Sequence, residues 1–412
     1  DYLKWRGDLS FSQAPFNEID AAILSTIVYI DYSALVPSDP FDPPVRMRDV
    51  GIRYFFDREK DTPLGVTLTA SIMKMFRAIY LLPRYANIGM TAFSADTSIT
   101  EERQFGALTF RLTDTESAVV LRGTDDSLVG WLEDCNLARM SVISAQSCTK
   151  AYFERVSAAI PGRFYICGHS KGANLAAFPA ATVSPELQDR ILGAYSLDGP
   201  GFYKGFVEQE GYQRVKDKIF HIIPQGSIVG TFFYSADNDI VVRSTNVGVF
   251  QHDPCSWRLM RDCFERVPEG LTVQAKRNAD NFNARVASMS AQQIDDFVET
   301  FFGVLESTGA TTLSELTNHA LLKMASGIRA LNTLDKRTKD NMNSVIAQLI
   351  RIRIFTHAEE RSRTKEEKEA EEKSNEKKHR QRKHLLPVKG RLLLPLYQKK
   401  INTISLGKII FM

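Results

Sequence analysis

The chain has 412 residues, of which 43% are hydrophobic and 25% are charged, a balance typical of water-soluble globular proteins. This composition excludes a wholly disordered chain, a collagen-like repeat and a protein with several membrane spans. The most apolar window, residues 21–30, is closed by Asp20 and Asp31 and is too short to cross a bilayer. Because the chain starts at Asp1 rather than at a methionine, the lack of a signal peptide carries little weight.

The net charge of +3 is unevenly distributed along the chain. Residues 358–412 hold 15 basic and 8 acidic side chains, which leaves 37 basic and 41 acidic side chains for the rest. A mildly acidic body has no basic face to follow phosphates, so we expect no nucleic-acid partner. The basic tail is expected to make at most weak contact with an anionic membrane surface, because Pro387 and Pro395 interrupt any amphipathic helix.

The cysteines give no sign of a disulfide framework or a metal site. There are five of them, irregularly spaced, without a Cys-x-x-Cys pair or a histidine at zinc-binding spacing. This usage favours a reducing, cytoplasmic setting, and we expect neither a metal nor another cofactor.

The predicted elements change in character along the chain. The first part favours helices at 15–32 and 68–82, with a proline-rich loop at 37–45 between them. Short apolar strands then alternate with helices, with strands expected at 106–112, 117–122, 163–167, 191–197, 218–223 and 240–243 and helices at 145–159 and 171–181. This alternation predicts an α/β fold, a mainly parallel sheet flanked by helices.

The strand pattern stops after about residue 255, and the sequence predicts three regions. Residues 1–270 are expected to form the α/β domain. Residues 271–357 are expected to form a helical extension, because periodic apolar segments recur at 294–305 and 313–330. Residues 358–412 are charged and are expected to be disordered.

The sequence Gly-His-Ser-Lys-Gly at 168–172 is a G-x-S-x-G motif. The motif alone is a weak signal, but here an apolar strand leads into it and an alanine-rich helix leads out. This context predicts a nucleophile elbow, in which a strained turn exposes the oxygen of Ser170 at the carboxyl end of the sheet. The start of the following helix would stabilise an anion beside that oxygen.

A serine hydroxyl needs a base to accept its proton. Three histidines precede residue 300. His169 adjoins the serine in the turn, where its side chain is expected to face away, and His221 lies mid-strand and is expected to pack within the sheet. His252 follows the last predicted strand in a loop, where an α/β-hydrolase carries its base.

Three aspartates are candidates for the acid that orients this histidine. Asp198 ends a predicted strand in an Asp-Gly-Pro context between the serine and the histidine in sequence, and we favour it. Asp237 and Asp239 lie on a later loop and remain alternatives.

An oxyanion hole requires two hydrogen-bond donors. The amide of Lys171 is one candidate, and Thr124, in the turn that ends the strand at 117–122, is the other. The segment after this turn includes Trp131 and suits either a mobile cover over an apolar pocket or ordinary core packing.

These motifs resemble the class 3, or fungal-type, lipases. The resemblance rests on Arg-Gly-Thr at 122–124, Trp-Leu-Glu-Asp at 131–134 and the motif at 168–172. The opening residues 1–11 and Gln-His-Asp-Pro-Cys-Ser-Trp at 251–257 are similar to a group of bacterial lipase-like α/β-hydrolases, and the likeness covers about residues 1–330. It implies Ser170 as nucleophile, His252 as base and Thr124 as oxyanion donor.

The chain departs from the class 3 pattern at one position. Those lipases carry the acid in an Asp-Ile-Val run, and the matching place here reads Ser-Ile-Val from Ser227. The acid must therefore lie elsewhere. Asp198 matches the acid position of pancreatic-type lipases, whereas Asp239 opens a later Asp-Ile-Val run.

These observations predict a serine hydrolase that cleaves acyl esters or lipids through a Ser-His-Asp triad and an acyl-enzyme. One alternative is a hydrolase-like scaffold of weak or no activity that binds a lipid or protein partner, motivated by the serine at 227. Another is acyl transfer or peptide hydrolysis by the same triad. The oligomeric state is not predicted by the sequence.

Overall fold

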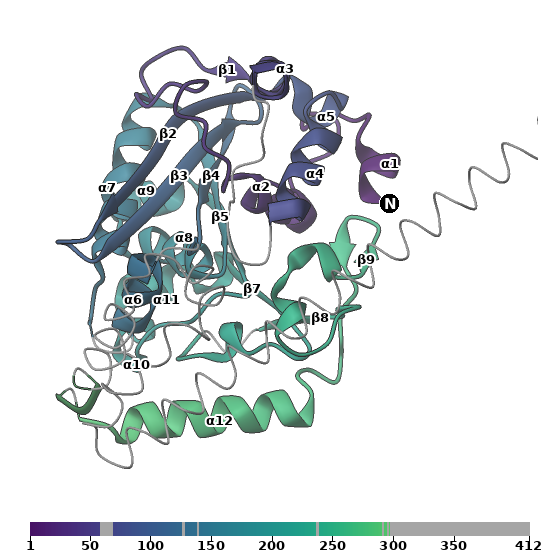
Figure 1. The fold of residues 1–412 in the computed structure, drawn as a ribbon. Helices are drawn as coiled ribbons and strands as arrows, with labels where there is room; N and C mark the ends of the chain where they lie inside the picture. The colour runs from purple at the N-terminus through teal and green to yellow at the C-terminus, as the bar shows by residue number, and fades with distance from the viewer. Residues whose placement is uncertain are drawn as a thin grey trace, which may run out of the picture. The chain divides into compact units, whose positions relative to one another are not determined.

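The computed structural model describes residues 1–57, 69–125, 128–137, 140–235, 239–290, 292–294 and 296 (Figure 1). These residues all belong to one compact unit, Asp1–Gln348. Their centre is an eight-stranded sheet in which each strand pairs with the next one in sequence. The strands are β1 (Val45–Arg46), β2 (Gly89–Ser98), β3 (Arg103–Arg111), β4 (Glu116–Leu121), β5 (Arg163–His169), β6 (Ile191–Leu197), β7 (Ile219–Pro224) and β8 (Ile240–Val242).

The sheet is antiparallel at its start and parallel where the motif lies. The pairs from β1 to β4 are antiparallel, and those from β4 to β8 are parallel. Strands β4, β5, β6 and β7 therefore end at the same edge, where α/β proteins place their sites. A separate antiparallel pair is formed by β9 (Leu259–Met260) and β10 (Cys263–Phe264).

Helices cover both faces of the sheet (Figure 1). The longest are α2 (Glu18–Ile27), α3 (Met47–Asp57), α4 (Thr69–Ile79), α7 (Ser144–Ala159), α8 (Lys171–Thr182) and α12 (Val273–Ser288). The shorter ones are α1 (Tyr2–Arg6), α5 (Pro83–Ala86), α6 (Leu128–Asn136), α9 (Pro185–Asp189), α10 (Lys204–Val207) and α11 (Glu210–Val215). Helices α2 and α4 pack in one apolar cluster and α7 and α8 in the other. The described residues thus form an α/β fold with a mainly parallel sheet.

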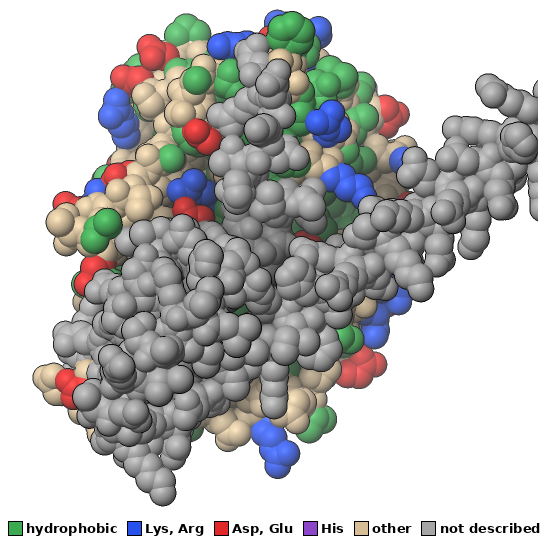
Figure 2. Space-filling model, viewed as in Figure 1, with side chains coloured by type: hydrophobic (Ala, Val, Ile, Leu, Met, Phe, Trp, Pro, Cys, Tyr) green, Lys and Arg blue, Asp and Glu red, His purple; other side chains and the backbone are tan. Residues whose placement is uncertain are grey.

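Part of the surface over α3 and α4 is apolar (Figure 2). Ile52, Phe56 and Leu81 are exposed by 48%, 87% and 59% respectively. Exposed apolar residues are common on protein surfaces, so these three carry no functional conclusion by themselves. No helix among the described residues is long and apolar enough to cross a membrane.

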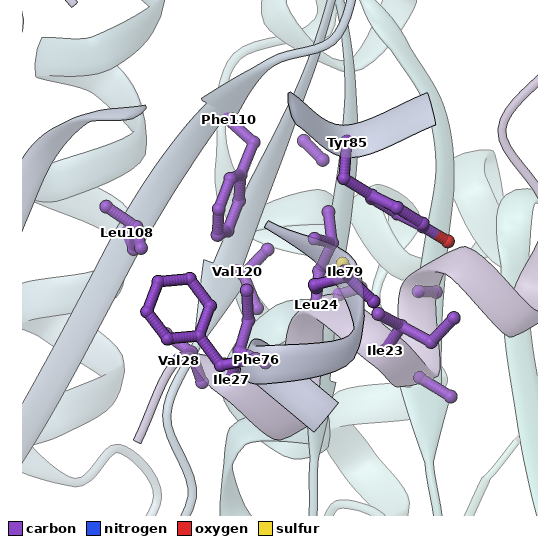
Figure 3. Packing of buried hydrophobic residues seen from close by; sticks show 14 of the residues in the cluster. Ile23, Leu24, Ile27, Val28, Phe76, Ile79, Tyr85, Leu108, Phe110 and Val120 are labelled. Atoms are coloured by element: carbon purple, nitrogen blue, oxygen red, sulfur yellow. The ribbon is translucent and has the colours of Figure 1, made fainter. Parts of the chain in front are cut away.

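Side-chain alternation along β4 shows how one strand serves two cores. Ala118 and Val120 pack in the cluster that contains α2 and α4, whereas Val119 and Leu121 pack in the cluster that contains α7 and α8. Successive side chains of a strand point to opposite faces, so a strand buried on both faces is apolar throughout. Figure 3 shows the first cluster, where side chains of α2, α4 and α5 meet those of β3 and β4.

A buried ion pair fixes the amino-terminal helices to one another. Asp20 on α2 and Arg84 on α5 are both fully buried, and Arg84 Nε donates to Asp20 Oδ1 at 2.9 Å. Tyr85 donates its hydroxyl to the same carboxylate at 2.6 Å. Asn17 caps α2 with a reciprocal side-chain bond to Asp20, so the helix begins at Glu18.

Most elements predicted between residues 106 and 243 are confirmed. Every strand expected there is present within a few residues, and so are the helices now seen as α7 and α8. The helix expected at 15–32 is shorter, because its cap sets the start at Glu18 and the regular helix ends at Ile27. Strand β2 was not predicted.

The predicted division of the chain into three regions stays a prediction. Helix α12 begins at Val273, inside the segment expected to be helical. The helices expected at 294–305 and 313–330 are described only at 294 and 296, and residues 358–412 lie outside the described residues.

Candidate active site

Ser170 occupies a strained turn between β5 and α8. Its φ is 59° and its ψ is −133°, a backbone conformation that L-residues rarely adopt. A Cβ on Gly168 would lie 2.1 Å from the carbonyl oxygen of Gly172, and one on Gly172 would lie 2.4 Å from that of Leu121. Both glycines are therefore required by close backbone approach. The predicted strand–turn–helix context of the motif is confirmed.

Asp198 and His252 form a hydrogen-bonded pair although they are far apart in sequence. His252 Nδ1 lies 2.7 Å from Asp198 Oδ2. A carboxylate can only accept, so Nδ1 carries a proton, and in the neutral form of the ring Nε2 has none and can act as a base. Asp198 follows β6 directly with a φ of 46° and is buried, and the structure brings it together with the preferred histidine.

Two further donors hold the Asp198 carboxylate. Ser227 Oγ donates to Oδ1 at 2.5 Å, and the Gly230 amide donates to the same oxygen at 3.1 Å. Burial acts to raise the pKa of Asp198, but the hydrogen bonds from His252 and Ser227 and the charge of His252 outweigh it, so the pKa is lowered. Ser227, which stands where the class 3 lipases carry their acid, thus donates a hydrogen bond to the carboxylate of Asp198.

Asp239 belongs to a different pair. His221 Nδ1 lies 2.7 Å from Asp239 Oδ1, and Ser235 Oγ donates to the same oxygen at 2.7 Å. The other ring nitrogen, His221 Nε2, donates to the Gly199 carbonyl at 3.0 Å. Burial acts to lower the pKa of His221, but the bond and charge of Asp239 prevail and raise it. Asp237 lies outside the described residues.

His169 contacts the histidine partner of Asp198, which the sequence did not indicate. Its Nε2 donates to the His252 carbonyl at 2.6 Å, and the two rings lie with centroids 4.4 Å apart. Burial, and next the charge of His252, lower the pKa of His169 to about 3. His169 therefore stays neutral at ordinary pH and holds the backbone and ring of His252.

This lowered pKa gives a testable pH dependence of stability. Because unfolded histidine has a pKa near 6.5, the unfolded state binds a proton at residue 169 between pH 6.5 and about 3 that the folded state does not. The free energy of unfolding therefore falls as pH drops through this window, by up to about 1.4 kcal/mol per pH unit from this group. We expect His169→Gln to show a shallower fall in urea denaturation. At pH 8 the free energies of unfolding of the two proteins should differ only by the contacts that the histidine side chain makes. Equal slopes of the free energy of unfolding against pH would contradict the expectation.

The predicted oxyanion residues also lie at the turn. A Cβ on Gly123 would lie 2.6 Å from the His169 carbonyl oxygen and 3.3 Å from Ser170 Cβ, so the end of β4 lies against the elbow. The next residue, Thr124, donates its hydroxyl to Asp134 Oδ2 at 2.6 Å. That hydroxyl is therefore engaged within the protein.

Lys171 is the first residue of α8, as predicted. The sequence did not indicate that its side chain is buried in an ion pair. Its ammonium group is buried and donates to Glu133 Oε2 at 2.9 Å. Glu133 lies on α6, the short helix that follows β4, and is itself buried. The side chain of Trp131 lies outside the described side chains.

An apolar hollow of about 700 Å³ lies beside the loop that follows His252. Its walls come from α1, α2 and α4 and from the segment after the histidine, and they include Ile19, Ala22, Ile23, Ala78, Pro254 and Cys255. Such a hollow can take an apolar chain. Among the described residues, no three His, Cys, Asp or Glu side chains are grouped as a metal site would require.

Fold and site together define an α/β protein with a serine in a strained turn between β5 and α8 and a buried aspartate paired with a histidine. A family model described as Mbeg1-like matches residues 79–303, which is more than half of the chain. The chain belongs to the Mbeg1-like family.

Other comparisons add little. No curated protein matches the chain. A solved structure titled "Crystal structure of M37 lipase" is similar over 66% of this chain and 83% of that chain, with 10% identity and a TM-score of 0.32. A likeness this distant carries no conclusion about the site.

Proposed function

We propose that this protein is a serine hydrolase that cleaves acyl esters through Ser170, His252 and Asp198. The observation that carries the proposal is the 2.7 Å bond between His252 Nδ1 and the buried Asp198, formed at the sheet edge that presents Ser170 in its strained turn. Serine, acid and histidine follow one another in the chain order of the α/β-hydrolases, and the proposal includes that fold.

The reaction follows from the chemistry of these groups. His252 Nε2 takes the hydroxyl proton of Ser170 as the oxygen attacks the ester carbonyl, and the C–O bond forms. The amides of Thr124 and Lys171 stabilise the oxyanion of the tetrahedral intermediate. The intermediate expels the alcohol, which takes the proton from His252, and water then hydrolyses the acyl-enzyme by the same steps in reverse. Asp198 stabilises the imidazolium throughout.

The substrate is proposed to carry an apolar acyl chain. The hollow beside the loop after His252 is lined mostly by apolar side chains, and Leu81, next to the lining residue Leu82, is exposed. An acyl ester or lipid substrate would bury its chain there and gain about 0.8 kcal/mol for each methylene removed from water.

Filling this hollow should shift the acyl-chain preference. Ala78 is exposed on α4 and lines the hollow, so a tryptophan there can reach into it at little cost to the core. We expect Ala78→Trp to lower kcat/KM for long-chain p-nitrophenyl esters by about tenfold relative to the butyrate ester, the effect of losing contact with two methylenes.

The matched control is Ala284→Trp, at an exposed position on α12 that does not line the hollow. It should leave the chain-length profile unchanged. If Ala78→Trp and wild type show the same dependence of kcat/KM on acyl-chain length, the acyl chain does not bind in the hollow.

A fluorophosphonate probe tests the proposed function. We expect the probe to label the wild-type protein at Ser170, as mapped by mass spectrometry, and a short-chain p-nitrophenyl ester to be hydrolysed. If neither labelling nor hydrolysis occurs, the triad is inactive, and the alternative of a scaffold that binds a lipid or protein partner is favoured. Labelling at another serine would refute the role of Ser170.

A further inference from the structure

A lysine immediately follows the proposed nucleophile, and its charge is buried. The side chain of Lys171 is 1% exposed, as is that of its partner Glu133. Removing an ammonium group from water is expensive unless it is paired and hydrogen-bonded. Both groups must therefore have a complete set of partners, and the structure supplies them.

The partners of Lys171 come from two elements around the site. The ammonium group donates to Glu133 Oε2 at 2.9 Å, to the Gln104 carbonyl at 3.2 Å and to Gln104 Oε1 at 3.1 Å, which uses its three protons. Glu133 also accepts the amide of Gln104 at 3.0 Å and the amide of Ala145 at 2.8 Å. One ion pair thus joins β3, α6, α7 and α8.

The same cluster reaches the second proposed oxyanion donor. Asp134, next to Glu133 on α6, has its Oδ1 3.7 Å from the Lys171 ammonium group. Its Oδ2 accepts the hydroxyl of Thr124 at 2.6 Å. A series of side-chain contacts therefore runs from Lys171 to Asp134 to Thr124. It connects the two residues whose backbone amides are proposed to bind the oxyanion.

We propose that the Lys171 side chain, with Glu133 and Asp134, is a positioning cluster that holds the amides of Thr124 and Lys171 in fixed relation at the oxyanion hole. This inference rests on the proposed function. The ion cluster itself touches no substrate. Lys171 supplies one amide, and its side chain lies near Asp134, which accepts the hydroxyl of Thr124. The position of the Thr124 amide therefore depends on the side chain of Lys171.

The position of the cluster has a kinetic consequence. An oxyanion exists in the transition state and not in the bound ester, so misplaced donors lower kcat and leave KM nearly unchanged. Loss of one such donor costs about 10²–10³ in kcat, and a displaced donor costs somewhat less. A lysine with a merely structural role would lower stability without this signature.

Two variants test the cluster at its two ends. Lys171→Met removes the charge and keeps an unbranched apolar chain. Thr124→Val keeps the backbone amide and removes the hydroxyl that bonds Asp134. We expect each to lower kcat by about 10–100-fold with KM within about threefold of wild type, and to weaken binding of a trifluoromethyl ketone, which forms an oxyanion on Ser170, by a similar factor. Thr124→Ser, which keeps the hydroxyl, should recover most of the loss seen in Thr124→Val.

The control is a second buried ion pair elsewhere in the fold. Asp20→Asn breaks the pair with Arg84 that joins α2 and α5. We expect it to lower the melting temperature without changing kcat per molecule, with active molecules counted by fluorophosphonate titration. This control separates loss of stability from loss of positioning.

The outcomes distinguish this inference from the proposed function. If wild type is labelled and active, and folded Lys171→Met and Thr124→Val keep its kcat and its ketone affinity, the positioning role is refuted while the triad stands. A rise in KM at constant kcat would refute it as well. If Lys171→Met does not fold, Thr124→Val and its serine counterpart decide the question. Failure of wild type to react with the probe would instead refute the proposed function.

Discussion

Replacing Ser170 by alanine is expected to lower kcat for a short-chain p-nitrophenyl ester by about 10⁴–10⁶. The triad acts as a unit, so without the nucleophile the histidine and its aspartate have nothing to activate. The backbone strain at this residue, with φ at 59°, is the same for alanine as for serine. The fold should therefore remain, as far-UV circular dichroism and the melting temperature will show.

Ser184→Ala serves as the matched control. Ser184 lies at the N-cap of α9, and its loss should leave kcat unchanged. A Ser170→Ala protein that keeps more than a tenth of wild-type activity would contradict a covalent mechanism at this residue. Loss of fluorophosphonate labelling in Ser170→Ala alone would support it independently of the ester chosen.

The parallel half of the sheet was predictable because its strands are apolar on both faces. Strands β4, β5 and β6 carry long apolar runs, and the helices between them have small or amphipathic sequences. The elbow was predictable for a related reason. A side chain at Gly168 or Gly172 would clash with backbone atoms, so the spacing of the two glycines indicates the turn.

Strand β2 was not predictable by the same rules. Its pairing with β3 shifts register between Thr91 and Ser94, and Ala92 adopts a φ of 54°. This irregularity interrupts the alternation of period two by which strands are recognised. Its second half is also largely exposed and polar, so it lacks the apolar pattern of a core strand.

The interactions around Lys171 were hidden from the sequence for a different reason. A lysine beside a surface turn is expected to be solvated, since buried lysines are rare. Its partners Gln104 and Glu133 are 67 and 38 residues away along the chain. The packing of α6 against β3 brings these groups together at the start of α8. Local pattern does not encode such a long-range pairing.

The choice among the acids shows the same limit. Asp198 ends one strand and Asp239 lies next to the start of another, so position along the chain left both open. In the sheet, Ser196 of β6 lies opposite His221 of β7, and His221 takes Asp239 as its partner. The carboxylate of Asp198 is then the one that meets His252.

This geometry predicts a large difference between two aspartate variants. We expect Asp198→Asn to lower kcat by about 10⁴, because an asparagine amide offers a donor to Nδ1, which favours the tautomer whose Nε2 carries the proton and cannot take another. Asp239→Asn, which alters only the pair with His221, should keep kcat within about tenfold of wild type. Both replacements keep side-chain volume and remove one charge, so each is the control for the other. Steady-state kinetics on one ester at pH 8 measures the contrast. Loss of activity in Asp239→Asn with activity retained in Asp198→Asn would transfer the role of the acid to Asp239.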